Sequence, residues 1–141
     1  MSLPTATTLL ALLAQQYLNS PYEWGGNGPF TFDCSGLVVK CLKDVNYDIP
    51  DMTSQQLYSH FISRSNRCSI EGDSLLFFGR NKQNISHVAI AVNDEWMIEA
   101  GGGDRLTRDI SDAARLDARV RYKPIQNRKD LVASIYIGNL L

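Results

Sequence analysis

Hydrophobic residues change their spacing part of the way along the chain. Three N-terminal segments repeat apolar residues every three or four positions, which is typical of amphipathic helices: 9–17, 34–45 and 54–61. Further along, apolar residues gather in short runs with the composition of strands: 74–78, 87–92 and 96–100. Helices followed by an antiparallel sheet predict an α+β fold in which the N-terminal helices pack on the sheet.

Capping and turn residues set the expected boundaries of the helices. Thr7 or Thr8 is a candidate cap for the first helix, which should end just before Pro21 because the residue before a proline avoids helical geometry. Thr53 or Ser54 can cap the third helix in the same way.

The C-terminal third of the sequence is less regular. After the glycines at 101–103 a polar stretch predicts no further element until 119–125, which is expected to add a strand. The segment 130–141 is apolar enough for a last strand or a helix, and its pattern leaves both open.

Length and composition limit the classes of function. A chain of 141 residues predicts one domain over 1–141, and a net charge of −1 argues against nucleic acid as a partner. The chain has three cysteines, an odd number, and no CxxC pair, which argues against a full disulfide framework. Its two histidines, His60 and His87, lie far apart in the sequence, which argues against a zinc site. The apolar N-terminal segment lacks the basic residues of a signal peptide and is too short to span a membrane.

Cys34 lies where a glycine-rich loop becomes a helix. The first turn of a helix has unpaired N–H groups and the positive end of the dipole, which favour the nucleophilic thiolate. Asp33, a candidate cap of that turn, opposes the thiolate by its charge, so a neighbouring imidazolium becomes important. The alternative interpretation is that Cys34, like most free cysteines, is an apolar side chain packed in the interior.

His87 begins a predicted strand and is the candidate base for this nucleophile. Along a strand, His87, Ala89 and Ala91 face one way, and the two alanines are expected to leave room for a helix end or a substrate there. Thiolate and imidazole within hydrogen-bond reach stabilise each other's charged forms.

Several short motifs resemble, in order, blocks of the NlpC/P60 family of peptidoglycan cysteine peptidases. They are "PYEWGG", "FDCSGLV", "IPDMTSQQ", "EGDSLLFF", "SHVAIAV" and "WMIEA". They cover about 20–122, which leaves 125–141 as a C-terminal extension. The resemblance implies a papain-like fold and cleavage of the amide between D-glutamate (or D-isoglutamine) and the diamino acid of the stem peptide.

Carried over by position, the resemblance assigns roles to seven residues. Cys34 is the nucleophile, His87 the base and then acid, and Glu99 the group that orients the histidine. Glutamate departs from the family's usual histidine, asparagine or glutamine, but a carboxylate still accepts the imidazole N–H and favours the imidazolium, as an acid does in other triads. The implied substrate-binding residues are Tyr22, Asp33, Ser35 and Ser54, with Tyr22 beside the nucleophile and Asp33 able to hold a substrate amine.

The hairpin offers a geometric test of this triad. Residues directly opposite each other on the two strands of a hairpin share a face, and side chains alternate along each strand. His87 and Glu99 therefore share a face only if the numbers of two opposite residues sum to an even value, as with Ala89 opposite Glu99. A three-residue loop at 93–95, closed by Val92 and Trp96, satisfies that condition, whereas a two-residue loop turns Glu99 away.

These observations predict a cell-wall hydrolase without cofactors. The missing signal peptide and the absence of a wall-binding module point to a phage or prophage protein, made in the cytoplasm and acting on the wall as a tail component or endolysin, with phage tail proteins as further partners. Two alternatives stay open. One is an N-acetylmuramoyl-L-alanine amidase or acyltransferase with the same Cys34 and His87, and the other is a non-enzymatic tail or wall-binding protein.

The remaining chemistry-bearing residues receive plainer interpretations. Cys41 is expected in the core, Cys68 in a loop, His60 on the surface, and Trp24 packed within its loop. The basic residues are interpreted as a solvated face, with docking to an anionic surface as the minority view: Arg115, Arg119, Arg121, Lys123, Arg128 and Lys129.

Overall fold

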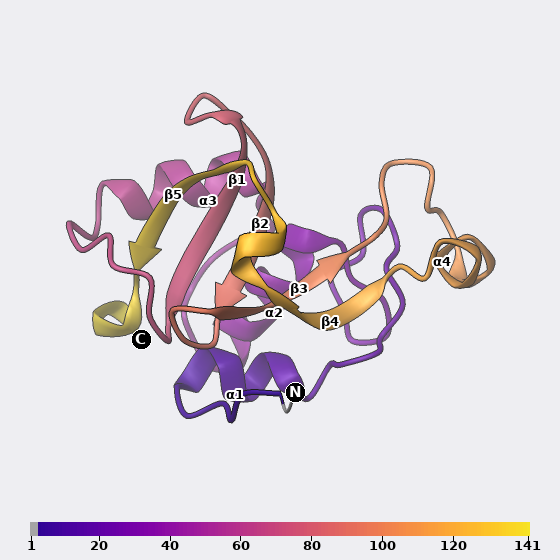
Figure 1. Ribbon diagram of the computed structural model, residues 1–141, viewed down its shortest axis with the longest axis horizontal. Helices are drawn as coiled ribbons and strands as arrows, with labels where there is room; N and C mark the ends of the chain where they lie inside the picture. Colours follow the sequence, from indigo (N-terminus) through magenta and orange to yellow (C-terminus); the bar gives the residue numbers. More distant parts are fainter. Residues whose placement is uncertain (1–2) are drawn as a thin grey trace.

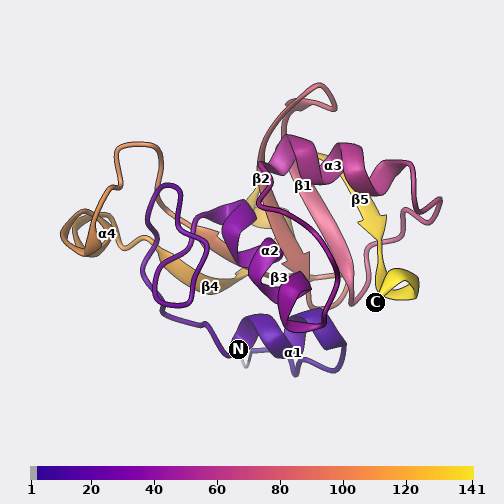
Figure 2. The ribbon, with the colours of Figure 1, turned by 180° about the vertical axis from the view of Figure 1, so that it is seen from behind.

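The computed structural model describes residues 3–141 and has the α+β architecture expected from the sequence. Three helices, α1 (Leu9–Gln15), α2 (Cys34–Asp44) and α3 (Ser54–Ile62), precede a five-stranded antiparallel sheet. Its strands are β1 (Ser74–Asn81), β2 (Asn84–Ala91), β3 (Trp96–Gly101), β4 (Arg119–Pro124) and β5 (Leu131–Tyr136), in the order β4-β3-β2-β1-β5. The helices cover one face of the sheet (Figures 1 and 2). None of the described helices has the length and apolar character needed to cross a membrane.

The helix caps follow the sequence at α2 and α3. Asp33 caps α2, and Thr53 forms a capping box with Gln56 at the start of α3. Thr8 does occupy the N-cap position of α1, but its side chain makes no capping bond, and α1 ends at Gln15, before the expected limit near Pro21. The residues between Gln15 and Pro21 continue as turns instead.

The β2–β3 hairpin has the predicted register. Ile90 pairs with Ile98, and the Val92 N–H donates to the Trp96 carbonyl at 2.8 Å, so the loop is 93–95. The same frame places His87 and Glu99 on one face of the sheet. From the sequence, 79–86 is expected to connect the first two strands. In the structure β1 and β2 both extend into this segment and join at a two-residue turn, with Asn81 opposite Asn84.

The two faces of the sheet carry different hydrophobic clusters. The larger one joins the helices to alternate strand residues such as Val88 and Ile90, and Cys34 packs against it. Ala89 and Ala91 lie on the other face, in the smaller cluster with Leu76, Phe78, Met97 and Ile125. The expectation that these alanines leave room for a helix end is therefore wrong, because larger side chains of their own face fill that space.

The C-terminal segment resolves the choice between strand and helix. β5 pairs with β1 along the sheet edge, and the chain then ends in the 3-10 turn η2 (Gly138–Leu140). Between β4 and β5, the 3-10 turn η1 (Ile125–Asn127) crosses the face opposite the helices (Figure 1). The helix α4 (Ile110–Leu116), which the polar pattern did not predict, stands apart from the sheet (Figures 1 and 2).

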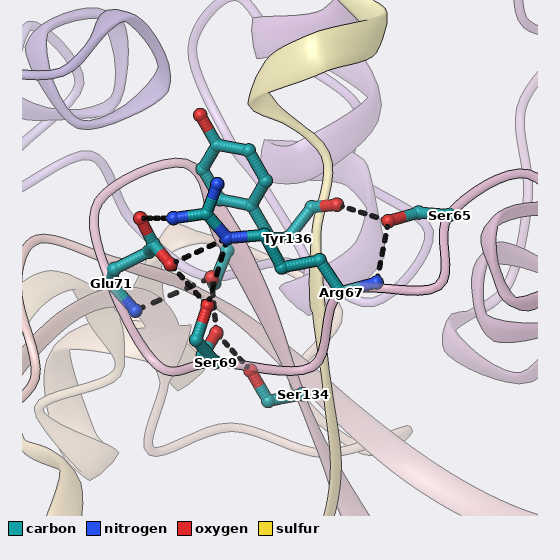
Figure 3. A network of polar contacts seen from close by, with 7 residues as sticks. Ser65, Arg67, Ser69, Glu71, Ser134 and Tyr136 are labelled. Atoms are coloured by element: carbon teal, nitrogen blue, oxygen red, sulfur yellow. Dashed lines mark hydrogen bonds and ion pairs between the residues drawn. The ribbon is translucent and has the colours of Figure 1, made fainter.

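The loop before β1 is tied to β5 by a network of polar contacts (Figure 3). Arg67 donates to both carboxylate oxygens of Glu71, and its guanidinium lies over the Tyr136 ring. Ser65 donates to the Tyr136 carbonyl, and Ser134 donates to the Ser69 carbonyl. This network holds the loop along the β5 edge of the sheet.

Candidate active site

The first turn of α2 is fixed by Asp33. One carboxylate oxygen accepts the Gly36 N–H at 2.7 Å, and the other accepts the Gly25 N–H at 3.0 Å. The preceding loop and the helix are therefore joined through one side chain, which holds Cys34 at the first helical position.

Cys34 reaches the edge of β2 where the sheet opens. The β2–β3 ladder extends only from Ala91–Met97 to Ile90–Ile98, and beyond it the Val88 N–H faces the Cys34 sulfur. The N–H groups of Ser35 and Cys34 itself also face that sulfur. Three backbone donors therefore face the sulfur, and one of them, the Val88 N–H, belongs to the residue that follows His87.

The surroundings of Cys34 favour the thiol over the thiolate. Burial, followed by the charge of Asp33, raises the pKa of Cys34 to about 11, and the three backbone N–H groups lower it by less. Asp33 opposes the thiolate, as expected from the sequence, and burial of the sulfur, which the sequence did not show, opposes it further. Attack by Cys34 thus needs a group that takes its proton.

His87 is oriented by Glu99. Its Nε2 lies 2.8 Å from Glu99 Oε1, and the two residues are 8% and 1% exposed. With Nε2–H donating to the carboxylate, a neutral imidazole carries its lone pair on Nδ1. Nδ1 is therefore the nitrogen that can act as a base.

Glu99 also faces two cations from β4. Arg121, its cross-strand partner, lies 3.1 Å from Oε2, and the Lys123 Nζ lies 3.9 Å from the same oxygen. Burial of the carboxylate raises its pKa, but the hydrogen bond and charge of His87 and the charges of Lys123 and Arg121 outweigh it and lower the pKa to about 2. Gly101 provides the space, since a Cβ there would overlap the Glu99 carboxylate.

All seven site residues predicted from the sequence line one cavity of about 800 Å³. The set is Tyr22, Asp33, Cys34, Ser35, Ser54, His87 and Glu99. The structure thus brings together residues from the N-terminal loop, α2, α3, β2 and β3.

The polar residues on the α2 side are mostly held by the protein. Ser35 donates to Asp33 at 3.2 Å, and Ser54 lies 3.5 Å from the Ile85 carbonyl. Tyr22 is 4% exposed, and burial followed by the charges of Cys34 and Asp33 raises its pKa well above the usual range. Its hydroxyl therefore stays protonated and can donate a hydrogen bond.

The sequence interpretation missed several residues that line the cavity. Trp24 is 57% exposed and borders the cavity instead of packing within its loop. Arg121, Lys123 and Arg128 also line it, so they are not the purely solvated face that was expected. Alternation along 119–125 could have indicated that Arg121 and Lys123 share a face, but not which strand lies beside theirs.

The other singled-out residues lie outside the cavity. Cys41 is buried and Cys68 is exposed, as predicted. His60 is partly buried and lies 2.7 Å from the Tyr47 hydroxyl, so it is not simply a surface residue. Among residues 3–141, no three His, Cys, Asp or Glu side chains are grouped as a metal site requires.

Comparisons with known proteins identify the family of the chain. The family model described as "NlpC/P60 family" matches residues 19–123. The chain is 37% identical over 87 residues to probable endopeptidase p60 of Listeria monocytogenes, covering 62% of this chain and 17% of the relative. It is 36% identical over 116 residues to the bifunctional muramidase/DL-endopeptidase CwlT of Bacillus subtilis, covering 80% of this chain and 35% of the relative.

A solved structure adds a contrast. RipD of Mycobacterium tuberculosis, described as a non-catalytic NlpC/p60 domain protein adapted to peptidoglycan binding, superposes with a TM-score of 0.65 at 16% identity, covering 90% of this chain and 93% of that one. This likeness shows the shared fold alone. The present chain spans well under half the length of the curated relatives above. The family model matches residues 19–123, which is most of the chain and includes the seven predicted site residues. The chain therefore belongs to the NlpC/P60 family.

Proposed function

We propose that this chain is a cysteine peptidase that hydrolyses an amide bond in the stem peptide of bacterial peptidoglycan. One arrangement carries the proposal. Cys34, in the first turn of α2, opens on the same cavity as His87, whose Nε2 is held 2.8 Å from Glu99. Family membership and the endopeptidase names of p60 and CwlT support the substrate class.

Acylation begins with a proton transfer. Because the resting thiol is protonated, Nδ1 of His87 takes its proton as the Cys34 sulfur attacks the scissile carbonyl carbon. The imidazolium that forms is stabilised by the adjacent Glu99 carboxylate, which remains ionised because its pKa is about 2.

The oxyanion forms beside backbone donors. The N–H groups of Cys34 and Ser35 at the helix start, with the Tyr22 hydroxyl, are the candidate donors to it. Tyr22 suits this role because burial keeps its hydroxyl protonated.

The remaining steps return the enzyme to its starting state. The C–N bond breaks, and the His87 imidazolium gives its proton to the leaving amine. Water then attacks the thioester while His87 takes its proton, and the C–S bond breaks to release a carboxylic acid and restore the Cys34 thiol.

The proposed scissile bond joins D-glutamate or D-isoglutamine to the diamino acid. The DL-endopeptidase name of CwlT, to which four-fifths of the chain aligns, supports this bond. Asp33, Ser35 and Ser54 lie on the α2 and α3 side of the cavity, where they are proposed to contact the N-terminal part of the stem peptide. Action on the wall as a phage tail component or endolysin stays a prediction from the sequence.

Product analysis of digested peptidoglycan tests this function. The wild-type chain is expected to release fragments whose masses identify the cleaved bond, and Cys34→Ala is expected to release none above background. Cys68→Ala, which removes an exposed thiol outside the cavity, is the matched control and should match the wild type. Undiminished digestion by Cys34→Ala contradicts the proposed mechanism.

The same masses separate the alternatives. An N-acetylmuramoyl-L-alanine amidase releases intact stem peptides from the glycan, and an acyltransferase forms a new bond instead of a hydrolysed end. Wall binding without any product, as the description of RipD implies for that protein, is the outcome for a non-enzymatic role.

A further inference from the structure

Two cations line the imidazole side of the catalytic cavity. Lys123 shares a strand face with Arg121, and its Nζ lies 3.9 Å from Glu99 Oε2. The Arg128 guanidinium lies 4.8 Å from the centre of the Phe78 ring, which in turn lies 5.6 Å from the centre of the His87 ring. Lys123 and Arg128 therefore both lie around the His87–Glu99 pair.

Both cations keep donors that the protein does not use. Asp130 accepts from Nε and Nη2 of Arg128 at 3.0 and 2.9 Å, which leaves three of the five guanidinium N–H groups without an acceptor in residues 3–141. The Lys123 Nζ makes no hydrogen bond within the same residues, since its 3.9 Å distance from Glu99 Oε2 is too long for one. The two side chains are 27% and 26% exposed, so they are half-buried in the cavity wall with N–H groups to offer.

The local charge is also unbalanced. Three cations, Arg121, Lys123 and Arg128, face two carboxylates, Glu99 and Asp130. The other end of the cavity carries Asp33 and Asp104, whose charges act on Tyr22, and one cation, Arg105, so carboxylates outnumber cations there. The cavity is thus positive beside the imidazole and acidic beside Tyr22, and an anionic group of a substrate is favoured at the imidazole end.

The reaction determines which part of the substrate lies at that end. The leaving amine receives its proton from His87, so the residue that carries this amine must lie on the imidazole side. We infer that Lys123 and Arg128 bind a free carboxylate of the residue that carries the leaving amine. This inference rests on the proposed function and adds a specificity for the leaving side of the bond.

Two sources can supply such a carboxylate. One is the side chain of a diamino acid that bears a carboxyl group, and the other is the chain terminus when the leaving residue is the last one. Four synthetic peptides of the form L-Ala-γ-D-Glu-X separate these sources. In the first pair, X is diaminopimelic acid whose terminal carboxyl is blocked as the amide, and its side-chain carboxyl is either free or amidated. In the second pair, X is L-lysine, and its terminal carboxyl is either free or amidated.

We expect the peptides with a free carboxylate on X to be cleaved with a kcat/KM about tenfold higher than their amidated partners, since a charge-assisted contact has that magnitude. A preference in the diaminopimelic acid pair assigns the side-chain carboxylate, and one in the lysine pair assigns the terminal carboxylate. Either result supports the inference. Equal cleavage within both pairs overturns it and leaves the proposed function intact.

Variants identify the residues responsible. Lys123→Gln and Arg128→Gln are each expected to lower the acid-to-amide ratio, and the double variant to bring it close to one. The ratio is insensitive to general loss of active protein, because both peptides report on the same enzyme. An undiminished ratio in the double variant overturns the assignment to these residues.

Lys129→Gln is the matched control. Lys129 follows Arg128 in the chain, but it is exposed, contacts the Gln126 carbonyl and does not line the cavity. Its substitution should change neither the ratio nor the rate. Failure of the wild type to cleave all four peptides and purified peptidoglycan overturns the proposed function, and the inference with it.

Discussion

Glu99 and Glu71 each pair with an arginine, at opposite sides of the sheet and in different surroundings. Glu99 is 1% exposed, and its partner Arg121 comes from the neighbouring strand, 22 residues along the chain. Glu71 pairs with Arg67 within one loop, and both side chains are about one-third or more exposed (Figure 3). The same two residue types thus form a buried, long-range pair at the cavity and an exposed, local pair beside β5.

The difference in burial decides what each pair does. Around Glu99, little water competes with His87, Arg121 and Lys123, so these groups hold an ionised carboxylate against the imidazole. Around Glu71, water screens the charges, and the Arg67 pair mainly shapes the loop against Tyr136. The Glu99–Arg121 pair is therefore a functional candidate because it is buried at the cavity that contains Cys34. The Glu71–Arg67 pair has the same residue types but lies in an exposed loop.

Removing one partner of the buried pair is expected to have the largest effect. Arg121→Leu leaves the Glu99 carboxylate buried with less compensation, and we expect a loss of about 3–5 kcal/mol in the free energy of unfolding, with a matching loss of peptidase activity. Urea denaturation measures the first quantity. Glu99→Gln/Arg121→Leu, which removes both charges, should recover more than half of the lost stability, and a cost of Arg121→Leu no larger than that of Arg67→Leu contradicts the comparison.

Acid should weaken the fold through Glu99. The pKa of this carboxylate is about 2 in the folded protein against 4.5 unfolded, so the unfolded chain binds the proton first as the pH falls. Its contribution is fully present above about pH 4.5 and is lost as the pH approaches 2, and 2.5 units correspond to at most about 3 kcal/mol.

Stability measured against pH for the wild type and Glu99→Gln tests this linkage. Other carboxylates titrate in the same range, so the difference between the two curves is the readout. The difference should change with pH below 4.5, where the unfolded chain binds a proton on Glu99 and the folded protein does not. A constant difference throughout the acid range contradicts the assigned pKa.

Gly101→Ala probes the space around the buried pair. The added methyl group would overlap the Glu99 carboxylate and approach Arg121, so we expect a loss of about 1–3 kcal/mol together with reduced activity. Combining it with Glu99→Ala removes the obstacle, and the cost of Gly101→Ala should then fall. The same cost in both backgrounds would show that the backbone, not the carboxylate, requires glycine.

The exposed pair should give the smallest change. Arg67→Leu removes a solvent-screened contact, so thermal unfolding and activity should stay close to those of the wild type. Proteolysis of the loop between Ser65 and Glu71 is expected to be faster, because the contact over Tyr136 is lost. A stability loss comparable with that of Arg121→Leu is the contrary result.

Local chemistry made several elements predictable. The capping box of Thr53 and Gln56, the Asp33 cap before Cys34 and the three-residue loop at 93–95 all depend on contacts between near neighbours in the chain. Because side chains alternate along strands, the loop length alone determined that Glu99 and His87 share a face.

Weak local patterns concealed other elements. α4 buries only Ala113 and leaves Ile110 63% exposed, so no amphipathic stripe marks it, and the Asp109 cap was its main signal. The segment 131–136 has the apolar composition of either a strand or a helix, and pairing with β1 selected the strand.

By itself, the sequence determined the order of the first three helices and of the three strands that follow them, the start of α2 at Cys34 and the register of the β2–β3 hairpin, because each depends on residues a few positions apart. Only the tertiary structure placed β4 beside β3, so that Arg121 and Lys123 meet Glu99, and brought Arg128 to the same cavity. It also added the largest effect on the pKa of Cys34, which is burial, since burial depends on everything packed around the sulfur. Charge and burial at the cavity are sums over distant segments, and no local pattern contains them.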